Sequence, residues 1–232
     1  MSGHSHKSKT ATQIERMIFF SDAVFAIAIT LLIIEIKVPH LQPEYSNKAI
    51  INAYMELGPK FLGFFTSFFF IGLYWTVHHQ LMSYLVNYDQ RLLWINLLYL
   101  VSIVLLPFST ALDSEYSGSN LRSPFLVYTL NILFAGYMIA ALWGYISNQK
   151  RRLSEGLENV LYVKYMQKRA LTVPVAFLIV FLIGLLIPFP YFGMSRILLV
   201  TIPFIMLALR KQYEKKPAVP VLQAEEVLPD PE

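Results

Sequence analysis

The sequence predicts an all-α membrane protein with six transmembrane helices and both termini in the cytoplasm. Three observations support this class. Of 232 residues, 56% are hydrophobic and only 15% are charged, whereas a soluble domain carries about 25% charged residues. The apolar residues form six blocks close to the roughly 20 residues that cross a bilayer. The basic residues also divide unequally between the two ends of these blocks, which orients the chain in the membrane.

The same composition excludes an ordinary soluble enzyme, a disordered chain and a nucleic-acid-binding domain. The net charge of +4 and pI near 9.1 therefore do not indicate a nucleic-acid partner. The chain has no cysteine, which excludes disulfides, thiolate metal sites and cysteine nucleophiles. Its first 16 residues are polar and the apolar run after them lacks a small-residue cleavage site, so we expect the first span to be retained.

Each apolar block is one predicted span. Together the six spans form one domain, with a polar segment before it and another after it. We predict a cytoplasmic N-terminal segment over residues 1–15, a six-helix transmembrane domain over 16–212 and a disordered cytoplasmic tail over 213–232. The six spans run over residues 17–36, 60–77, 92–112, 124–146, 170–187 and 191–209. Three of them contain a proline in the interior, Pro107, Pro174 and Pro203, which a membrane helix tolerates because its neighbours satisfy the freed carbonyls.

The basic residues decide the orientation. Of the 19 lysines and arginines, 14 lie in the N-terminal region up to Arg16, in the second and fourth connections and in the C-terminal region. The other five lie on the opposite side: Lys37, Lys48, Lys60, Arg122 and Arg196. Because cytoplasmic loops are enriched in basic residues, both termini should be cytoplasmic, with six crossings between them.

The first span contains the most unusual residue, Asp22. Thr12-Gln13-Ile14-Glu15 is a capping-box pattern and predicts a helix start near Thr12, which puts Asp22 well inside the helix. A carboxylate within a membrane span is costly and indicates a functional or network role. At 100° per residue, Ser21 and Asp22 fall away from one face, which is made up of Arg16, Phe20, Ala23, Ile27, Thr30, Leu31 and Ile34.

The second and third spans offer partners for Asp22. The second ends in Tyr74-Trp75-Thr76-Val77-His78-His79, and Asn96 lies early in the third, so these side chains should reach the depth of Asp22. We predict a Ser21–Asp22–His–Asn network in which either histidine is the partner. The alternative is that both histidines lie at headgroup level. A metal site is not expected, because no carboxylate or thiol cluster accompanies the pair.

The later spans carry packing signals. Gly136, Ala140 and Gly144 recur every four residues in the fourth span, which favours close helix packing. The last three spans do not repeat the first three, which weakens the case for an inverted-repeat transporter.

In the first span, Ile27 and Leu31 recur with Ile34 at helical spacing. By periodicity alone this stripe is typical of a lipid-facing or helix-packing surface.

A family resemblance gives the stripe a more specific interpretation. The run Arg16-Met17-Ile18-Phe19-Phe20-Ser21-Asp22 resembles the Arg-x-x-x-Phe-Ser-Asp signature of the endosomal/lysosomal potassium channel family and its prokaryotic relatives. The rest of the first span is also similar. So are the pairs Tyr74-Trp75 and His78-His79, and Asn96 followed by Leu106-Pro107-Phe108-Ser109-Thr110. The likeness is strong over the first three spans and weak over the last three.

The resemblance implies a homotetramer in which the first helix of each subunit lines a central pore. Ile27, Leu31 and Ile34 would form hydrophobic constrictions, and Thr30 would contact the ion. The family motif would hold the inner helices together through Arg16, Phe20, Ser21, Asp22, Trp75, His78, His79 and Asn96. The sequence lacks a Thr-Val-Gly-Tyr-Gly filter, and it has Ala23 where glycine is often found, which bears on the width of the pore.

The function we predict is a potassium-permeable cation leak channel without a carbonyl selectivity filter. It would be a multi-pass protein of a prokaryotic plasma membrane. Its partners would be the bilayer, monovalent cations and copies of itself, with no cofactor other than permeant potassium. Glu35, near the external end, could attract cations or pair with Lys37.

Three other functions are weighed against the channel. A proton-coupled secondary transporter would use Asp22 with His78 or His79, but only Asp22 and Glu35 provide carboxylates in the apolar runs. An intramembrane enzyme lacks the His-Glu-x-x-His and Gly-x-Ser-x-Gly motifs and has no paired aspartates, so we do not expect an enzyme. A scaffold would leave Ser21 and Asp22 unexplained.

Overall fold

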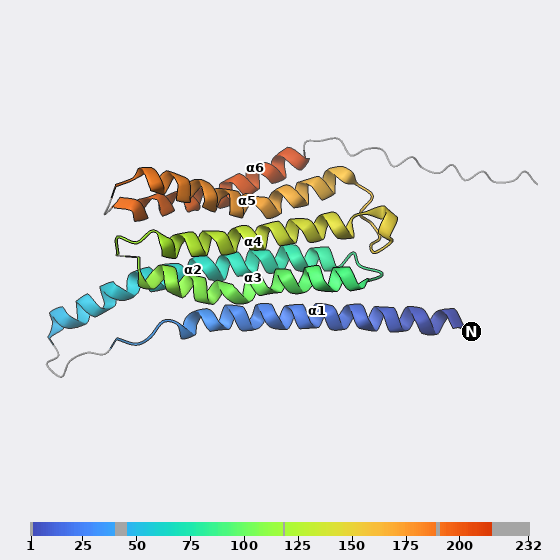
Figure 1. The fold of residues 1–232 in the computed structure, drawn as a ribbon, viewed down its shortest axis with the longest axis horizontal. Helices are drawn as coiled ribbons and strands as arrows, with labels where there is room; N and C mark the ends of the chain where they lie inside the picture. Colours follow the sequence, from blue (N-terminus) through green and yellow to red (C-terminus); the bar gives the residue numbers. More distant parts are fainter. Residues whose placement is uncertain (1, 40–45, 118, 189–190, 215–232) are drawn as a thin grey trace, which may run out of the picture.

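The structure is a bundle of antiparallel helices (Figure 1). This computed structural model describes residues 2–39, 46–117, 119–188 and 191–214. The long helices are α1 (Ser2–Ile34), α2 (Asn47–Met82), α3 (Gln90–Glu115), α4 (Ser123–Ile146) and α5 (Val160–Leu186). A short 3₁₀ turn η1 (Gln149–Arg151) lies between α4 and α5, and the 3₁₀ segment η2 (Tyr191–Thr201) leads into α6 (Ile202–Glu214).

The helices stack in an order that places α1 at one edge. It packs on α2 and α3; α3 then packs on α4, α4 on α5, and α5 on η2 and α6. The start of α1 and the end of α6 lie at the same end of the bundle (Figure 1).

Side-chain caps and one proline explain where several helices begin. Ser46, Asp89 and Asn159 each accept a hydrogen bond from a backbone N–H in the first turn of α2, α3 and α5, respectively. Pro124 occupies the first turn of α4, where a missing N–H has no cost. Since two of these caps lie well before the apolar runs, α2 and α5 begin earlier than their predicted spans.

The all-helical prediction is confirmed, and two of its details change. The helix α1 begins at Ser2, so the Thr12 capping-box pattern lies inside the helix and does not start it. Five described helices are long and apolar enough to cross a membrane, one within each of α1 to α5. The sixth predicted span is divided between η2 and α6, and the change occurs beside Pro203, which lies in the first turn of α6, where proline is favoured because its missing N–H has no helical partner.

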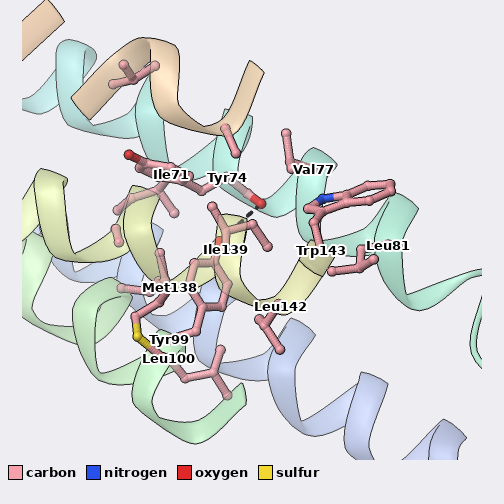
Figure 2. Close-up of a cluster of buried hydrophobic side chains, with 14 of the residues drawn as sticks. Ile71, Tyr74, Val77, Leu81, Tyr99, Leu100, Met138, Ile139, Leu142 and Trp143 are labelled. Atoms are coloured by element: carbon pink, nitrogen blue, oxygen red, sulfur yellow. Dashed lines mark hydrogen bonds between the residues drawn. The ribbon is translucent and has the colours of Figure 1, made fainter. Parts of the chain in front are cut away.

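The core lies between α2, α3 and α4 (Figure 2). Figure 2 shows Ile71, Tyr74 and Val77 of α2 facing Tyr99 of α3 and Trp143 of α4, and all five side chains are buried. The Tyr99 hydroxyl donates to the Tyr74 carbonyl at 3.2 Å, so this aromatic centre has a polar link between α2 and α3. The predicted tail, residues 213–232, lies outside the described residues except for the end of α6.

Candidate functional site

The two faces of α1 differ sharply in exposure. One face packs into the bundle through six buried residues spaced three or four apart: Ile14, Met17, Ser21, Phe25, Ala28 and Leu32. The opposite face is the one that the helical spacing groups around Ile27. Its members are all exposed: Arg16, Phe20, Ala23, Ile27, Thr30, Leu31 and Ile34. Ile27 is 59% exposed, Leu31 38% and Ile34 66%, so one subunit leaves a row of large aliphatic side chains uncovered.

The buried face of α1 is fixed by a chain of hydrogen bonds to α3 and α2. The Asn96 amide N–H donates to the Ser21 hydroxyl at 3.0 Å. His78 Nε2 lies 2.9 Å from the Asn96 amide oxygen. All three residues are buried. The predicted Ser–His–Asn contact between the first three helices is therefore present, with Asn96 between the other two side chains.

The direction of these bonds follows from the donors available. The Ser21 hydroxyl donates back to the Met17 carbonyl at 2.9 Å, so it must accept from Asn96. The Asn96 oxygen then accepts, which makes His78 Nε2 the donor. His78 Nδ1 is buried and has no hydrogen-bond partner among the described residues. The neutral imidazole with its proton on Nε2 is the form that fits this site.

Asp22 has a different partner from the one predicted. The Trp75 indole N–H donates to its carboxylate at 2.9 Å, and the ring of Trp75 lies 5.3 Å from that of His79. Neither histidine is hydrogen-bonded to Asp22 among the described residues. The cause is the 100° step between Ser21 and Asp22. Ser21 faces the inside of the bundle, whereas Asp22 faces the outer side of α2.

The remaining predicted residues lie on the exposed side of α1. Arg16 forms no ion pair within the described part of the chain. The Thr30 hydroxyl lies 2.9 Å from the Ile27 carbonyl and 3.1 Å from that of Ala26, so it donates back to its own helix. A hydroxyl that donates to the backbone keeps its lone pairs available for a further contact.

Glu35 lies beside a cavity at the far end of α1. The cavity has a volume of about 370 Å³ and lies between the ends of α1, α2 and α3. Lys37 also lines it, as do Lys60 and Glu115, which form an ion pair at 2.7 Å. Glu35 and Lys37 do not pair with each other in the described structure.

A second polar cluster was missed by the sequence reasoning. Asp113 belongs to α3 and not to the connection after it, and it is buried. Its carboxylate accepts from Arg196 of η2 at 2.8 Å, and the Arg196 guanidinium lies 4.5 Å from the centre of the Phe125 ring. The apolar spans therefore contain more acidic residues than Asp22 and Glu35. An arginine in the middle of the last apolar run was the signal for a buried acidic partner.

No group of three or more metal-ligating side chains gathers anywhere in the described residues. The site therefore consists of an exposed aliphatic row with one hydroxyl, held from behind by hydrogen bonds. This row is an apolar surface that the described residues of one subunit leave exposed.

Comparison with known proteins gives this arrangement a family context. A family model described as the endosomal/lysosomal potassium channel TMEM175 matches residues 16–107. A potassium channel of Chamaesiphon minutus is 35% identical over 137 residues, which cover 59% of this chain and 67% of that protein. A potassium channel of Streptomyces collinus is 36% identical over 130 residues, which cover 55% of this chain but only 62% of the relative's length.

Two further relatives extend the comparison. The chicken protein named endosomal/lysosomal proton channel TMEM175 is 35% identical over 136 residues, or 56% of this chain and 27% of that protein. The crystal structure of a lysosomal potassium-selective channel TMEM175 homologue from Chamaesiphon minutus matches with a TM-score of 0.68 and 26% identity. That match covers 87% of this chain and 98% of the solved one.

Proposed function

The chain belongs to the TMEM175 family, and from this premise we propose that it forms a potassium-permeable cation leak channel without a carbonyl selectivity filter. The relatives named as potassium channels support this function. The observation that carries it in this chain is the exposed row Ile27, Leu31 and Ile34, which lies on a different side of α1 from the face that packs into its own subunit.

The proposal needs several copies of the chain. The α1 row of one subunit lines only one side of an ion path. In a closed ring with rotational symmetry, the same face of each copy surrounds a central axis. We propose a homotetramer in which the exposed face of α1 lines this axis. The position of α1 at the edge of the bundle supports that arrangement, because none of the described residues of its own subunit covers the row (Figure 1).

The topology we propose has six crossings with both termini in the cytoplasm. Five crossings correspond to α1 to α5. The sixth is η2 followed by α6, whose lengths are about 22 Å at 2.0 Å per residue and about 20 Å at 1.5 Å per residue. Together they exceed the roughly 30 Å bilayer core. The excess of basic residues on one side sets the orientation, and we place the protein in a prokaryotic plasma membrane.

Conduction follows from the chemistry of the α1 row. A ring of four isoleucines is a constriction that excludes water when it is narrow. Movement of α1 would widen the ring, and ions would then pass with much of their hydration. Thr30 lies between Ile27 and Ile34, and its lone pairs could contact the cation because its proton is directed to the backbone.

The hydrogen bonds behind the row have a positioning role. The Ser21–Asn96–His78 chain and the Asp22–Trp75 bond hold α1 against α3 and α2. Asp22 is hydrogen-bonded to Trp75 and to neither His78 nor His79, so the residues of the transporter alternative are not joined by a direct hydrogen bond. A transporter would give saturable flux that depends on a proton gradient, whereas a channel gives unitary current steps.

The test is planar-bilayer recording from purified protein with potassium, sodium and caesium exchanged. Ile27→Asn should raise the conductance and reduce the preference for potassium, because an amide in the ring keeps water in the constriction. Ile33→Asn is the matched control, since Ile33 is exposed on a different side of α1. Unchanged currents from Ile27→Asn, or the same change from Ile33→Asn, would contradict the assignment of the row.

A further inference from the structure

The face of α5 that its neighbours leave uncovered changes from charged to apolar along the helix. Lys164 and Lys168 are exposed and lie one turn apart. The same face continues through four exposed apolar residues at helical spacing: Leu171, Val175, Leu178 and Leu182. Two cations therefore lie directly above an aliphatic strip on the outside of the bundle.

The length of α5 places the two lysines at the membrane surface. From Lys168 to the last residue, Leu186, the helix rises about 27 Å at 1.5 Å per residue. This is close to the roughly 30 Å of a bilayer core. When Leu186 lies at one boundary of the core, Lys168 lies at the other and Lys164 lies one turn further out, among the headgroups.

Neither lysine is neutralised within the described part of the chain. The ion pairs there join other residues. The acidic residue nearest in sequence, Glu158, precedes the helix, and its carboxylate accepts from the Gly156 backbone N–H at 3.2 Å. A lysine ammonium has three donors and no acceptor, so two adjacent ones favour a phosphate oxygen.

The surroundings of α5 indicate that this face meets lipid. The helix packs on α4 on one side and on η2 and α6 on the other (Figure 1), and the residues of the strip are exposed outside these contacts. The site depends only on the membrane placement of α5 and is independent of ion conduction.

We propose that this face of α5 binds an anionic glycerophospholipid. Lys164 and Lys168 contact the headgroup phosphate, and the strip from Leu171 to Leu182 packs against an acyl chain. Charge and apolar surface are both needed, so a zwitterionic lipid is bound more weakly, and a soluble phosphate without acyl chains is not held.

Native mass spectrometry of the full chain tests this site. Wild-type protein taken from nanodiscs with equal phosphatidylglycerol and phosphatidylcholine should retain phosphatidylglycerol preferentially. Lys164→Gln with Lys168→Gln should weaken that retention roughly 30-fold, because each surface lysine contributes about fivefold to anionic-lipid affinity. Glycerol 1-phosphate should not displace the lipid.

The matched control removes the same charge elsewhere on the side we assign to the cytoplasm. Lys9→Gln with Lys150→Gln changes two exposed lysines outside the strip and should leave retention unchanged. An equal loss from both pairs would overturn the site, as would displacement by glycerol 1-phosphate. The wild-type measurement decides the proposal even if the glutamine pair fails to fold, since equal retention of the two lipids contradicts it.

Discussion

At the scale of single residues, Asn96 is the centre of the contact between the first three helices. Among Ser21, His78 and Asn96, only Asn96 is hydrogen-bonded to both of the other side chains: its amide donates to Ser21 and accepts from His78. Hydrogen bonds among buried groups matter most when they are broken, because each orphaned group keeps its desolvation cost. Replacing Asn96 therefore affects three helices at once.

Asn96→Leu should lower the free energy of unfolding by about 1–3 kcal/mol, since it leaves the buried His78 Nε2–H without an acceptor, whereas the Ser21 hydroxyl keeps its bond to the Met17 carbonyl. Thermal unfolding in detergent measures the effect. Ser102→Ala is the control, because the buried Ser102 hydroxyl bonds to the Tyr99 carbonyl of its own helix and should cost less than about 1 kcal/mol. Similar losses from the two variants would show that Asn96 has no special role.

The sequence predicted the members of this network better than their pairing. Helical spacing correctly predicted that Ser21, His78 and Asn96 lie at the same depth, because the rise per residue of an α-helix is constant. The 100° step from Ser21 turns Asp22 toward α2, but spacing along the chain does not specify which side chain of α2 lies there. The hydrogen-bond donor to Asp22 is therefore the indole of Trp75 and not a histidine.

At the scale of elements, the contact between α4 and α5 depends on one missing side chain. A Cβ added at Gly136 would overlap the Pro174 ring of α5. Pro174 lies inside α5 and is buried. The small-residue spacing of α4 was correctly interpreted as a packing signal, and the structure identifies Pro174 as the group that needs the space.

Gly136→Ala should destabilise the protein by about 1–3 kcal/mol, because α4 and α5 must separate to admit the methyl group. Gly72→Ala provides the comparison. Nothing lies within 4 Å of the Cβ position at Gly72, so alanine there should be neutral or stabilise α2 by up to about 1 kcal/mol. Thermal unfolding of both variants checks this, and equal effects would rule out the steric explanation.

The first five predicted spans each agree with one helix, α1 to α5 in order, and they differ from these helices at the ends; the sixth is divided between η2 and α6. Apolar length defines the membrane-crossing part of a helix, but caps outside the bilayer define where it begins. Asn159 starts α5 ten residues before its predicted span, and the helix of α1 continues to Ser2. The 3₁₀ form of η2 has no counterpart in the apolar pattern, which is the same for both kinds of helix.

At the scale of the whole molecule, the Asp113–Arg196 ion pair connects the last segment to the centre of the bundle. Arg196 reaches from η2 to α3 and also lies over the Phe125 ring of α4. Both side chains are largely buried, at 25% and 11% exposure. The loss of one partner would leave the other charge buried and unpaired. The free-energy cost of that unpaired charge is larger than the net stabilisation that the intact pair provides.

Asp113→Asn should lower stability by about 2–4 kcal/mol, somewhat less than for a fully buried pair because Arg196 keeps some exposure. Glu115→Gln removes the neighbouring pair with Lys60, in which Glu115 is 61% exposed, and should cost less than about 1 kcal/mol. Thermal unfolding in one detergent compares the two variants. A larger loss from Glu115→Gln than from Asp113→Asn would contradict the importance of the buried pair.

The same ion pair has a consequence for how the chain is made. An arginine in an apolar segment opposes entry into the bilayer by about 2.5–3.5 kcal/mol at mid-span, and by less near the ends. Asp113 is synthesised long before Arg196, so its carboxylate is already present when the last segment leaves the ribosome. The order of residues along the chain thus makes insertion of the final segment depend on earlier helices that have already assembled.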